Sequence, residues 1–137
     1  MKDDILYTQL RFKAKRAASW DPTGYNKDGK IVSPGETCIL ADISGPAIIV
    51  HIWFAIDNGA RVDDPLFLKK NTLEMYWDNH NVPSVRVPIG DFFGVGHGKV
   101  RTYSSALFEM SVDAPAEKGA FNSWARMPFR TRGKVVL

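Results

Sequence analysis

Residues 72–98 hold the pattern that most restricts the fold of this chain. At the start of this stretch the apolar side chains of Leu73, Met75 and Trp77 alternate with polar ones. After the sequence Asp-Asn-His-Asn at 78–81, valine and isoleucine again alternate with serine, arginine and proline. A period of two places the apolar side chains on one face of a strand. The stretch therefore predicts a half-buried β-hairpin in a sheet with one packed side.

A glycine-rich loop follows the hairpin, with the sequence GDFFGVGHG at residues 90–98. Glycine allows a positive φ and close approach by other groups, so four glycines here are more than a simple connection requires. Between them stand Asp91, Phe92, Phe93 and His97. These side chains either line a binding site, or Asp91 caps the turn and the phenylalanines belong to the core.

Short strands are expected along most of the remaining chain, between turn-rich connections. The segments that predict them are residues 37–43, 47–56, 107–112 and 121–129. The run 47–56 is apolar on both faces, which indicates a central strand packed on both sides. We expect its His51 to be a hydrogen-bonded core residue rather than a ligand. Regular turn signals without an amphipathic helix predict an all-β fold, a β-sandwich.

The segment 121–129 separates its side chains onto two faces. The inward set is Ser123, Ala125, Met127 and Phe129. The outward set is Asn122, Trp124 and Arg126, which places an indole between an amide and a guanidinium. An exposed indole with polar neighbours is a suitable platform for stacking a sugar ring.

Composition restricts the class of protein further. A chain of 137 residues with 45% hydrophobic and 24% charged residues is typical of one globular domain. No apolar run approaches the roughly 20 residues that span a bilayer, and the N-terminus lacks the apolar core of a signal peptide. We therefore expect a cytoplasmic protein without a membrane partner. The single cysteine, Cys38, excludes an internal disulfide.

The net charge of +3 is unevenly distributed. Residues 1–16 carry five basic and two acidic side chains, and residues 126–137 carry four basic ones and no acid. The middle of the chain carries nine basic against thirteen acidic side chains. A surface that follows a phosphate backbone places basic side chains among exposed aromatics in the body of a domain. The distribution therefore argues against a nucleic-acid partner.

The motifs of several enzyme classes are absent. The chain has no nucleophile elbow, no phosphate-binding loop and no dinucleotide fingerprint. His51, His80 and His97 lack ligand partners at short spacing, so we expect neither a metal site nor a cofactor. A pair of carboxylates for glycoside hydrolysis stays open because fifteen acidic residues are present, although no spacing singles out two of them.

Four motifs in order resemble one known family. They are SWDPTGYN, PGETCILADISGPAIIVHIWF, MYWDNHNVPSVRVPIGDFFGVGHG and FNSWARMPF. Together, over about residues 16–134, they look like the N-terminal half of glycoside hydrolase family 172, previously a bacterial domain of unknown function. The family includes difructose dianhydride I synthase/hydrolase and exo-acting α-D-arabinofuranosidases. The resemblance implies two jelly-roll sandwiches per chain, assembly as trimers or their multiples, and retaining cleavage by two glutamates in a pocket near subunit interfaces.

This chain departs from the family pattern in two places. The family loop Tyr-Asp-Arg-Thr-Gly-Gly-Asn is here Trp-Asp-Pro-Thr-Gly-Tyr-Asn at residues 20–26. The family's catalytic glutamates follow the Met-Pro-Phe motif, which here stands at residues 127–129, near the last residue printed. We therefore expect an N-terminal arm at 1–18 and, at 19–137, the first jelly roll, truncated at its closing strand and inactive alone. Residues 135–137 are expected to begin a further strand.

The resemblance also implies which residues form the pocket wall for an oligosaccharide substrate. They are Asp21, Asn26, Asp91, Phe92, His97, Trp124 and Arg126, with no catalytic residue among them. Asp and Asn would bind sugar hydroxyls, Trp124 would stack and His97 would donate a hydrogen bond. Asp21 and Asn26 instead serve only their own turn if the loop is a plain connection. The alternative function is a non-catalytic carbohydrate-binding or structural assembly jelly roll, which an exposed sheet edge would drive to form a homo-oligomer.

Overall fold

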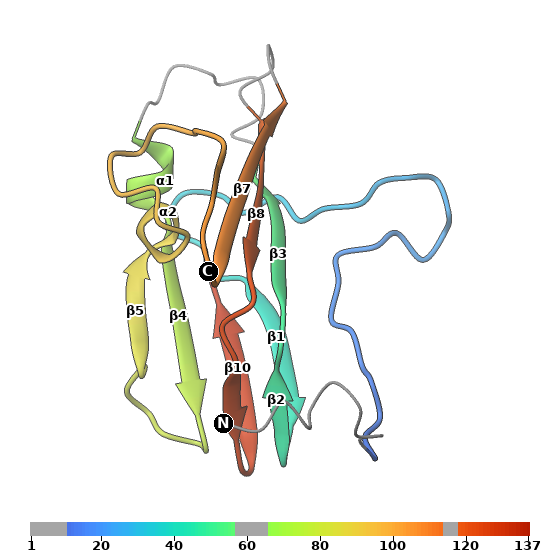
Figure 1. Ribbon diagram of the computed structural model, residues 1–137. Helices are drawn as coiled ribbons and strands as arrows, with labels where there is room; N and C mark the ends of the chain where they lie inside the picture. The colour runs from blue at the N-terminus through green and yellow to red at the C-terminus, as the bar shows by residue number, and fades with distance from the viewer. Residues whose placement is uncertain (1–10, 57–65, 114–117) are drawn as a thin grey trace.

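The computed structural model describes residues 11–56, 66–113 and 118–137, and these form an antiparallel β-sandwich (Figure 1). Its strands are β1 (Ile39–Ser44), β2 (Ala47–Ile49), β3 (Ile52–Ile56), β4 (Thr72–Trp77), β5 (Val85–Pro88), β6 (Tyr103–Ser104), β7 (Phe108–Asp113), β8 (Lys118–Ser123), β9 (Met127–Phe129) and β10 (Arg132–Val136). Two single-turn helices are α1 (Phe67–Lys70) and α2 (Ile89–Phe92). The prediction of an all-β sandwich is confirmed.

The strands form two sheets of four and a two-stranded sheet between them. One large sheet has the order β1-β10-β4-β5 and the other β3-β8-β7-β6, while β2 pairs with β9. No helix among the described residues is long and apolar enough to cross a membrane.

A single long antiparallel ribbon connects these sheets. Ile39 lies opposite Val136, Ile49 opposite Met127, and Ile56 opposite Gly119. The register therefore changes by no more than one residue from β1–β10 through β2–β9 to β3–β8. Because the ribbon bends between these pairs, its three parts count as separate sheets and its ends take part in both layers of the sandwich.

Two tightly packed glycines, Gly45 and Gly133, lie where the ribbon bends between the β1–β10 pair and the β2–β9 pair. The ring of Phe129 lies against Gly133, where an added Cβ would come within 2.6 Å of the ring. The same ring stacks on Trp77, with 5.9 Å between centroids and 7° between planes. A Cβ on Gly45 would approach the carbonyl oxygen of Arg130 to 2.6 Å. The backbone at Gly45 and Gly133 can come this close to residues 129 and 130 only because neither position carries a side chain.

The predicted hairpin is β4–β5, with Leu73 and Met75 fully buried. Asp78 and Asn79 begin its turn at positive φ, +54° and +64°. The Asp78 carboxylate accepts hydrogen bonds from the backbone N–H groups of Arg130 and Thr131, each at 2.7 Å. These hydrogen bonds, led by that from Thr131, lower the pKa of Asp78. One carboxylate thus fastens the β4–β5 turn to the β9–β10 turn.

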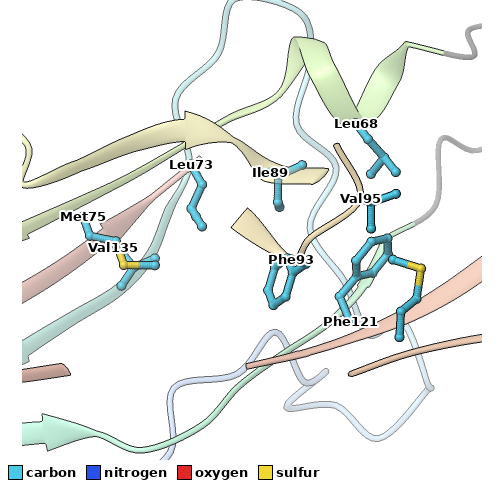
Figure 2. Close-up of a cluster of buried hydrophobic side chains, with 9 residues drawn as sticks. Leu68, Leu73, Met75, Ile89, Phe93, Val95, Phe121 and Val135 are labelled. Atoms are coloured by element: carbon cyan, nitrogen blue, oxygen red, sulfur yellow. The ribbon is translucent and has the colours of Figure 1, made fainter. Parts of the chain in front are cut away.

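The core lies between the two large sheets and is closed at one end by the helices (Figure 2). Its buried members are Leu68, Leu73, Met75, Ile89, Phe93, Val95, Met110, Phe121 and Val135. Phe93, from the glycine loop, stands at the centre, with its ring 5.5 Å from that of Phe121. Of the two phenylalanines left open by the sequence, Phe93 is therefore a core residue.

Three expectations were wrong. The run 47–56 is not one strand packed on both sides, because Val50 and His51 both face outward and divide it into β2 and β3. His51 is exposed rather than a core residue, although it is hydrogen-bonded as expected. Residues 135–137 do not begin a further strand, since 135 and 136 are the last residues of β10, which pairs on one side with β1 and on the other with β4.

The outer faces of the two large sheets differ in chemistry. On β4, β5 and β10 the outer face is polar: Glu74 binds the Tyr76 hydroxyl and Arg86, and Lys134 lies over the Tyr76 ring. On β3 the outer face carries Trp53, which is 53% exposed. This sheet therefore leaves apolar surface uncovered.

The N-terminal segment, defined here as residues 11–31, projects away from the sandwich (Figure 1). Apart from Asp21, which is partly buried, its residues are exposed. The Lys30 ammonium donates to the carbonyl of Ile39 and so ties the segment to the start of β1.

Replacing Phe121 by alanine tests the core. Phe121 is fully buried, so the change removes a ring and leaves a cavity beside Phe93. We expect the free energy of unfolding to fall by about 3–5 kcal/mol in urea denaturation. Val82, 74% exposed, provides the matched control, and Val82→Ala should change that free energy by less than about 0.5 kcal/mol. Equal effects of the two changes would contradict the described core.

The carboxylate of Asp78 should make stability depend on pH. Since its pKa is lower in the folded chain, ionisation stabilises the fold above the unfolded pKa, near 3.8, and this contribution is lost as the pH falls through the lowered value. Asp78→Asn keeps an acceptor and tolerates positive φ but cannot titrate. We expect the melting temperature of the wild type to exceed that of Asp78→Asn at neutral pH, and the difference to shrink below about pH 4. A difference independent of pH would show that the charge is not what holds the two turns together.

Candidate functional site

The glycine loop winds through consecutive turns after α2. The N–H of Gly94 donates to Asp91, that of Val95 to Gly90, and that of Gly98 to Val95. Gly94 has a φ of +76°, and a Cβ there would lie 2.7 Å from the hydroxyl oxygen of Tyr103. This position therefore requires glycine for two reasons, its φ and its lack of a side chain.

Tyr103 from β6 holds this loop in place. Its hydroxyl donates a hydrogen bond to the carbonyl of Phe93, and burial raises its pKa. Because Phe93 is anchored in the core, the backbone that follows it is held in a fixed position.

A hollow of about 590 Å³ lies beside the loop. Its lining residues are Gly94, Val95, Gly96, His97, Lys99, Arg101 and Tyr103. His97, Lys99 and Arg101 are exposed and offer an imidazole, an ammonium and a guanidinium. None of these described lining residues carries a carboxylate. The hollow can therefore donate several hydrogen bonds to hydroxyl or carboxylate oxygens, and bare glycine backbone allows a ring to approach.

The other predicted residues of this loop face inward or are already paired. The Asp91 carboxylate forms an ion pair with Lys69 of α1, at 2.5 Å. Phe92 packs edge-on against the rings of Phe93 and Phe108, with centroids 4.9 and 5.9 Å away. Both side chains therefore have structural partners, and of the three predicted loop residues His97 is the one that lines the hollow.

A second surface with functional chemistry covers β2, β3 and the end of β8, and we call it the tryptophan face. Its members are Ile48, Val50, His51, Trp53, Asn122 and Trp124. The imidazole of His51 stacks on the Trp124 indole, at 5.3 Å and 18°, and its Nε2 lies 3.0 Å from the Asn122 amide oxygen. One face of the Trp124 indole is thus occupied from within the chain, while the side chain as a whole stays 41% exposed.

Asp21 and Asn26 lie in the N-terminal segment. The Asp21 carboxylate accepts hydrogen bonds from the hydroxyl and N–H of Thr23 and from the N–H of Lys27. These bonds, the Thr23 hydroxyl first, lower its pKa. Asn26 takes a positive φ of +56° within the same turn. Their observed contacts are those of residues that brace a turn.

The seven predicted residues therefore do not converge on one site within the described chain. His97 lies beside β6, whereas the ring of Trp124 packs on His51 at the opposite edge of the same sheet. Arg126, also exposed, follows Trp124 in the connection to β9. Lys99 and Arg101 were missed, although both are exposed and lie within three residues of Gly98, the last glycine of the loop. Trp53 was missed because its strand was expected to be covered on both sides.

Nowhere among the described residues do three or more His, Cys, Asp or Glu side chains lie close enough together to hold a metal ion.

The order of motifs, the β-sandwich and the glycine loop all fit one family, and the GH172 domain-like family matches residues 23–137. The chain belongs to the GH172 family. No curated protein matches the sequence. The GH172 match includes the glycine loop, the tryptophan face and Asn26, and it begins two residues after Asp21. The chain is thus related to glycoside hydrolases, as its motifs implied.

Gly94→Ala tests the geometry of the GH172 glycine loop. Alanine at this positive φ is strained, and its Cβ would displace the Tyr103 hydroxyl, so we expect a loss of about 1–3 kcal/mol in unfolding free energy. Gly96→Ala is the matched control, because the nearest atom to its Cβ, an oxygen of Asp91, would be 3.9 Å away. We expect this control to lose under 1 kcal/mol in the same urea titration. If both variants are equally stable, the loop does not have the described path.

Proposed function

We propose that this GH172 domain is the N-terminal β-sandwich of a retaining, exo-acting hydrolase of α-fructofuranosides or α-D-arabinofuranosides. Its role is to supply part of the wall of the sugar pocket and a surface for assembly. The two carboxylates that break the glycosidic bond are contributed from outside these residues.

The observation that carries the proposal is the hollow beside the glycine loop. Its volume, about 590 Å³, lies in the range of small-molecule sites. Hydrogen-bond donors from His97, Lys99 and Arg101 converge on a concave surface built on glycine backbone and held by Tyr103. Sugars present hydroxyl oxygens that accept such bonds, and the family to which the chain belongs is related to glycoside hydrolases.

The same geometry supports a non-catalytic role for this sandwich. Retaining hydrolysis uses two carboxyl groups about 5–5.5 Å apart. The lining of the hollow contains no carboxylate, and nearby Asp91 is bound to Lys69. The hollow therefore suits positioning of a sugar, while the nucleophile and the acid/base residue are supplied from elsewhere in the complete active site.

His97→Ala should weaken binding of an α-D-arabinofuranosyl or α-D-fructofuranosyl oligosaccharide. Loss of one hydrogen bond costs about 1 kcal/mol, so we expect a roughly fivefold rise in the dissociation constant, measured by isothermal titration calorimetry. The matched control is His80→Ala. His80 is an exposed histidine in the β4–β5 turn, and its replacement should leave binding unchanged. The amide signals of residues 94–101 should shift in NMR titration with the same sugar.

Two results would contradict the proposal. One is absence of binding by the wild-type chain together with unshifted signals in the glycine loop. The other is turnover of either furanoside by these residues alone, which would place the catalytic carboxylates inside the sandwich. Binding without His97 dependence but with loss in Trp124→Ala would move the sugar to the tryptophan face and favour a carbohydrate-binding module.

A further inference from the structure

The tryptophan face is a surface feature of the described residues that the proposed sugar site does not explain. Ile48, Val50 and Trp53 are exposed to 45%, 51% and 53%, and Trp124 adds a second indole. The outer face of the other sheet instead carries the ion pairs and hydrogen bonds of Glu74 and its neighbours. Contiguous exposed apolar side chains on one face of a soluble domain mark a contact surface.

The run that forms this face is also apolar on both sides in the sequence. Residues 47–56 have the pattern of a strand buried on both faces, yet the sandwich covers one of them. The sequence pattern and the structure agree if another polypeptide segment, outside the sandwich itself, covers the second face. β3 is an edge strand of its sheet, so a partner can approach from the open side without displacing another strand.

The N-terminal segment also exposes large apolar side chains. It carries Phe12, Trp20, Tyr25 and Ile31, exposed to 72%, 66%, 80% and 98%. These four large side chains gain nothing from their own domain, from which the segment projects (Figure 1). Such a segment has apolar surface to bury but does not bury it where it stands.

The segment nevertheless has a defined shape. The N–H of Gly29 donates to the carbonyl of Ser19 at 2.9 Å, and that of Asp21 to the carboxylate of Asp28 at 2.7 Å. The Asp21 carboxylate in turn holds Thr23 and Lys27. The turn that presents Trp20 and Tyr25 is therefore formed before any contact is made, which lowers the entropic cost of docking.

We propose that the N-terminal segment of one copy docks on the tryptophan face of a second copy. The donor and acceptor surfaces differ, so the contact is heterologous, and each copy can give one segment and receive another. Repeated contacts of this kind form a closed ring when the rotation from one copy to the next divides a full turn evenly. Each buried aromatic side chain contributes about 150–250 Å², so Phe12, Trp20 and Tyr25 supply about 450–750 Å². Ile31 adds to this area and brings it close to the roughly 800 Å² per partner of a stable interface.

Assembly and sugar binding use different residues under this scheme. The hollow beside the glycine loop lies next to β6, whereas docking uses β2, β3 and the end of β8. The two proposals therefore succeed or fail independently.

The test is a pair of complementary variants of the full chain, measured by sedimentation velocity at increasing concentration. Trp20→Ser with Tyr25→Ser removes the donor, and Trp53→Ser removes the acceptor. All three side chains are more than half exposed, so circular dichroism and melting temperature should match the wild type. Val82→Ser, another exposed apolar residue, is the control and should not alter assembly.

We expect the wild type to associate and each variant to raise the dissociation constant by more than about tenfold. An equimolar mixture of the two variants should form a complex of two chains, because one retains the segment and the other retains the face. Failure of the mixture to associate would overturn the proposal in favour of contact between two tryptophan faces. A monomeric wild type would also overturn it, and protection of Trp53 from a fluorescence quencher in that monomer would assign the face to the chain's own segment.

Discussion

Backbone pairing between residues 39–56 and 119–136 is the constraint on which the rest of this domain depends. One antiparallel ribbon runs from the β1–β10 pair to the β3–β8 pair with almost constant register. Each layer of the sandwich is then completed from one side of the ribbon: β4 and β5 are added to β10, and β7 and β6 are added to β8. The core, including Phe93 and Phe121, fills the space between the two layers that the bent ribbon creates.

The ribbon also decides where the surfaces with functional chemistry lie. The glycine loop follows β5 and α2 in one layer and reaches Tyr103 in the other, so its backbone bridges the two sheets at the end that the helices close. The tryptophan face belongs to the ribbon itself, on the side that the sandwich does not cover. A domain with one hollow surface rich in hydrogen-bond donors and one flat aromatic surface is suited to two different partners, a small polar ligand and another polypeptide.

Much of the fold was predictable because it rests on local alternation. The burial of Leu73 and Met75 follows from the period of two along β4. The outward position of Trp124 also agrees with that period, although the expected strand 121–129 is interrupted at 124–126, between β8 and β9. The break at Val50 and His51 was not visible, because His51 stands in a run that is otherwise apolar and has no turn residue at this point. Contacts between residues distant in sequence were not predictable either, such as the hydrogen bonds from the N–H groups of Arg130 and Thr131 to the Asp78 carboxylate.

The site was less predictable than the fold. The glycines correctly drew attention to the loop, but which side chain faces solvent depends on partners elsewhere in the chain. Asp91 is occupied by Lys69, 22 residues away, and Phe92 by Phe108. The sequence near Asp91 does not indicate these partners, because they are distant along the chain. His97, by contrast, is exposed and lines the hollow.

The same ribbon affects the order in which the domain can form. Ile39 meets Val136 and Ile56 meets Gly119, so the central pairing joins parts of the chain that are distant in sequence. The β4–β5 hairpin, by contrast, closes a short loop and can form early. Such a high contact order implies slow folding, because the chain loses conformational entropy in closing long loops before the contacts of the ribbon can form. During synthesis, β1, β2 and β3 must wait, with their apolar side chains exposed, until their partner strand has left the ribosome.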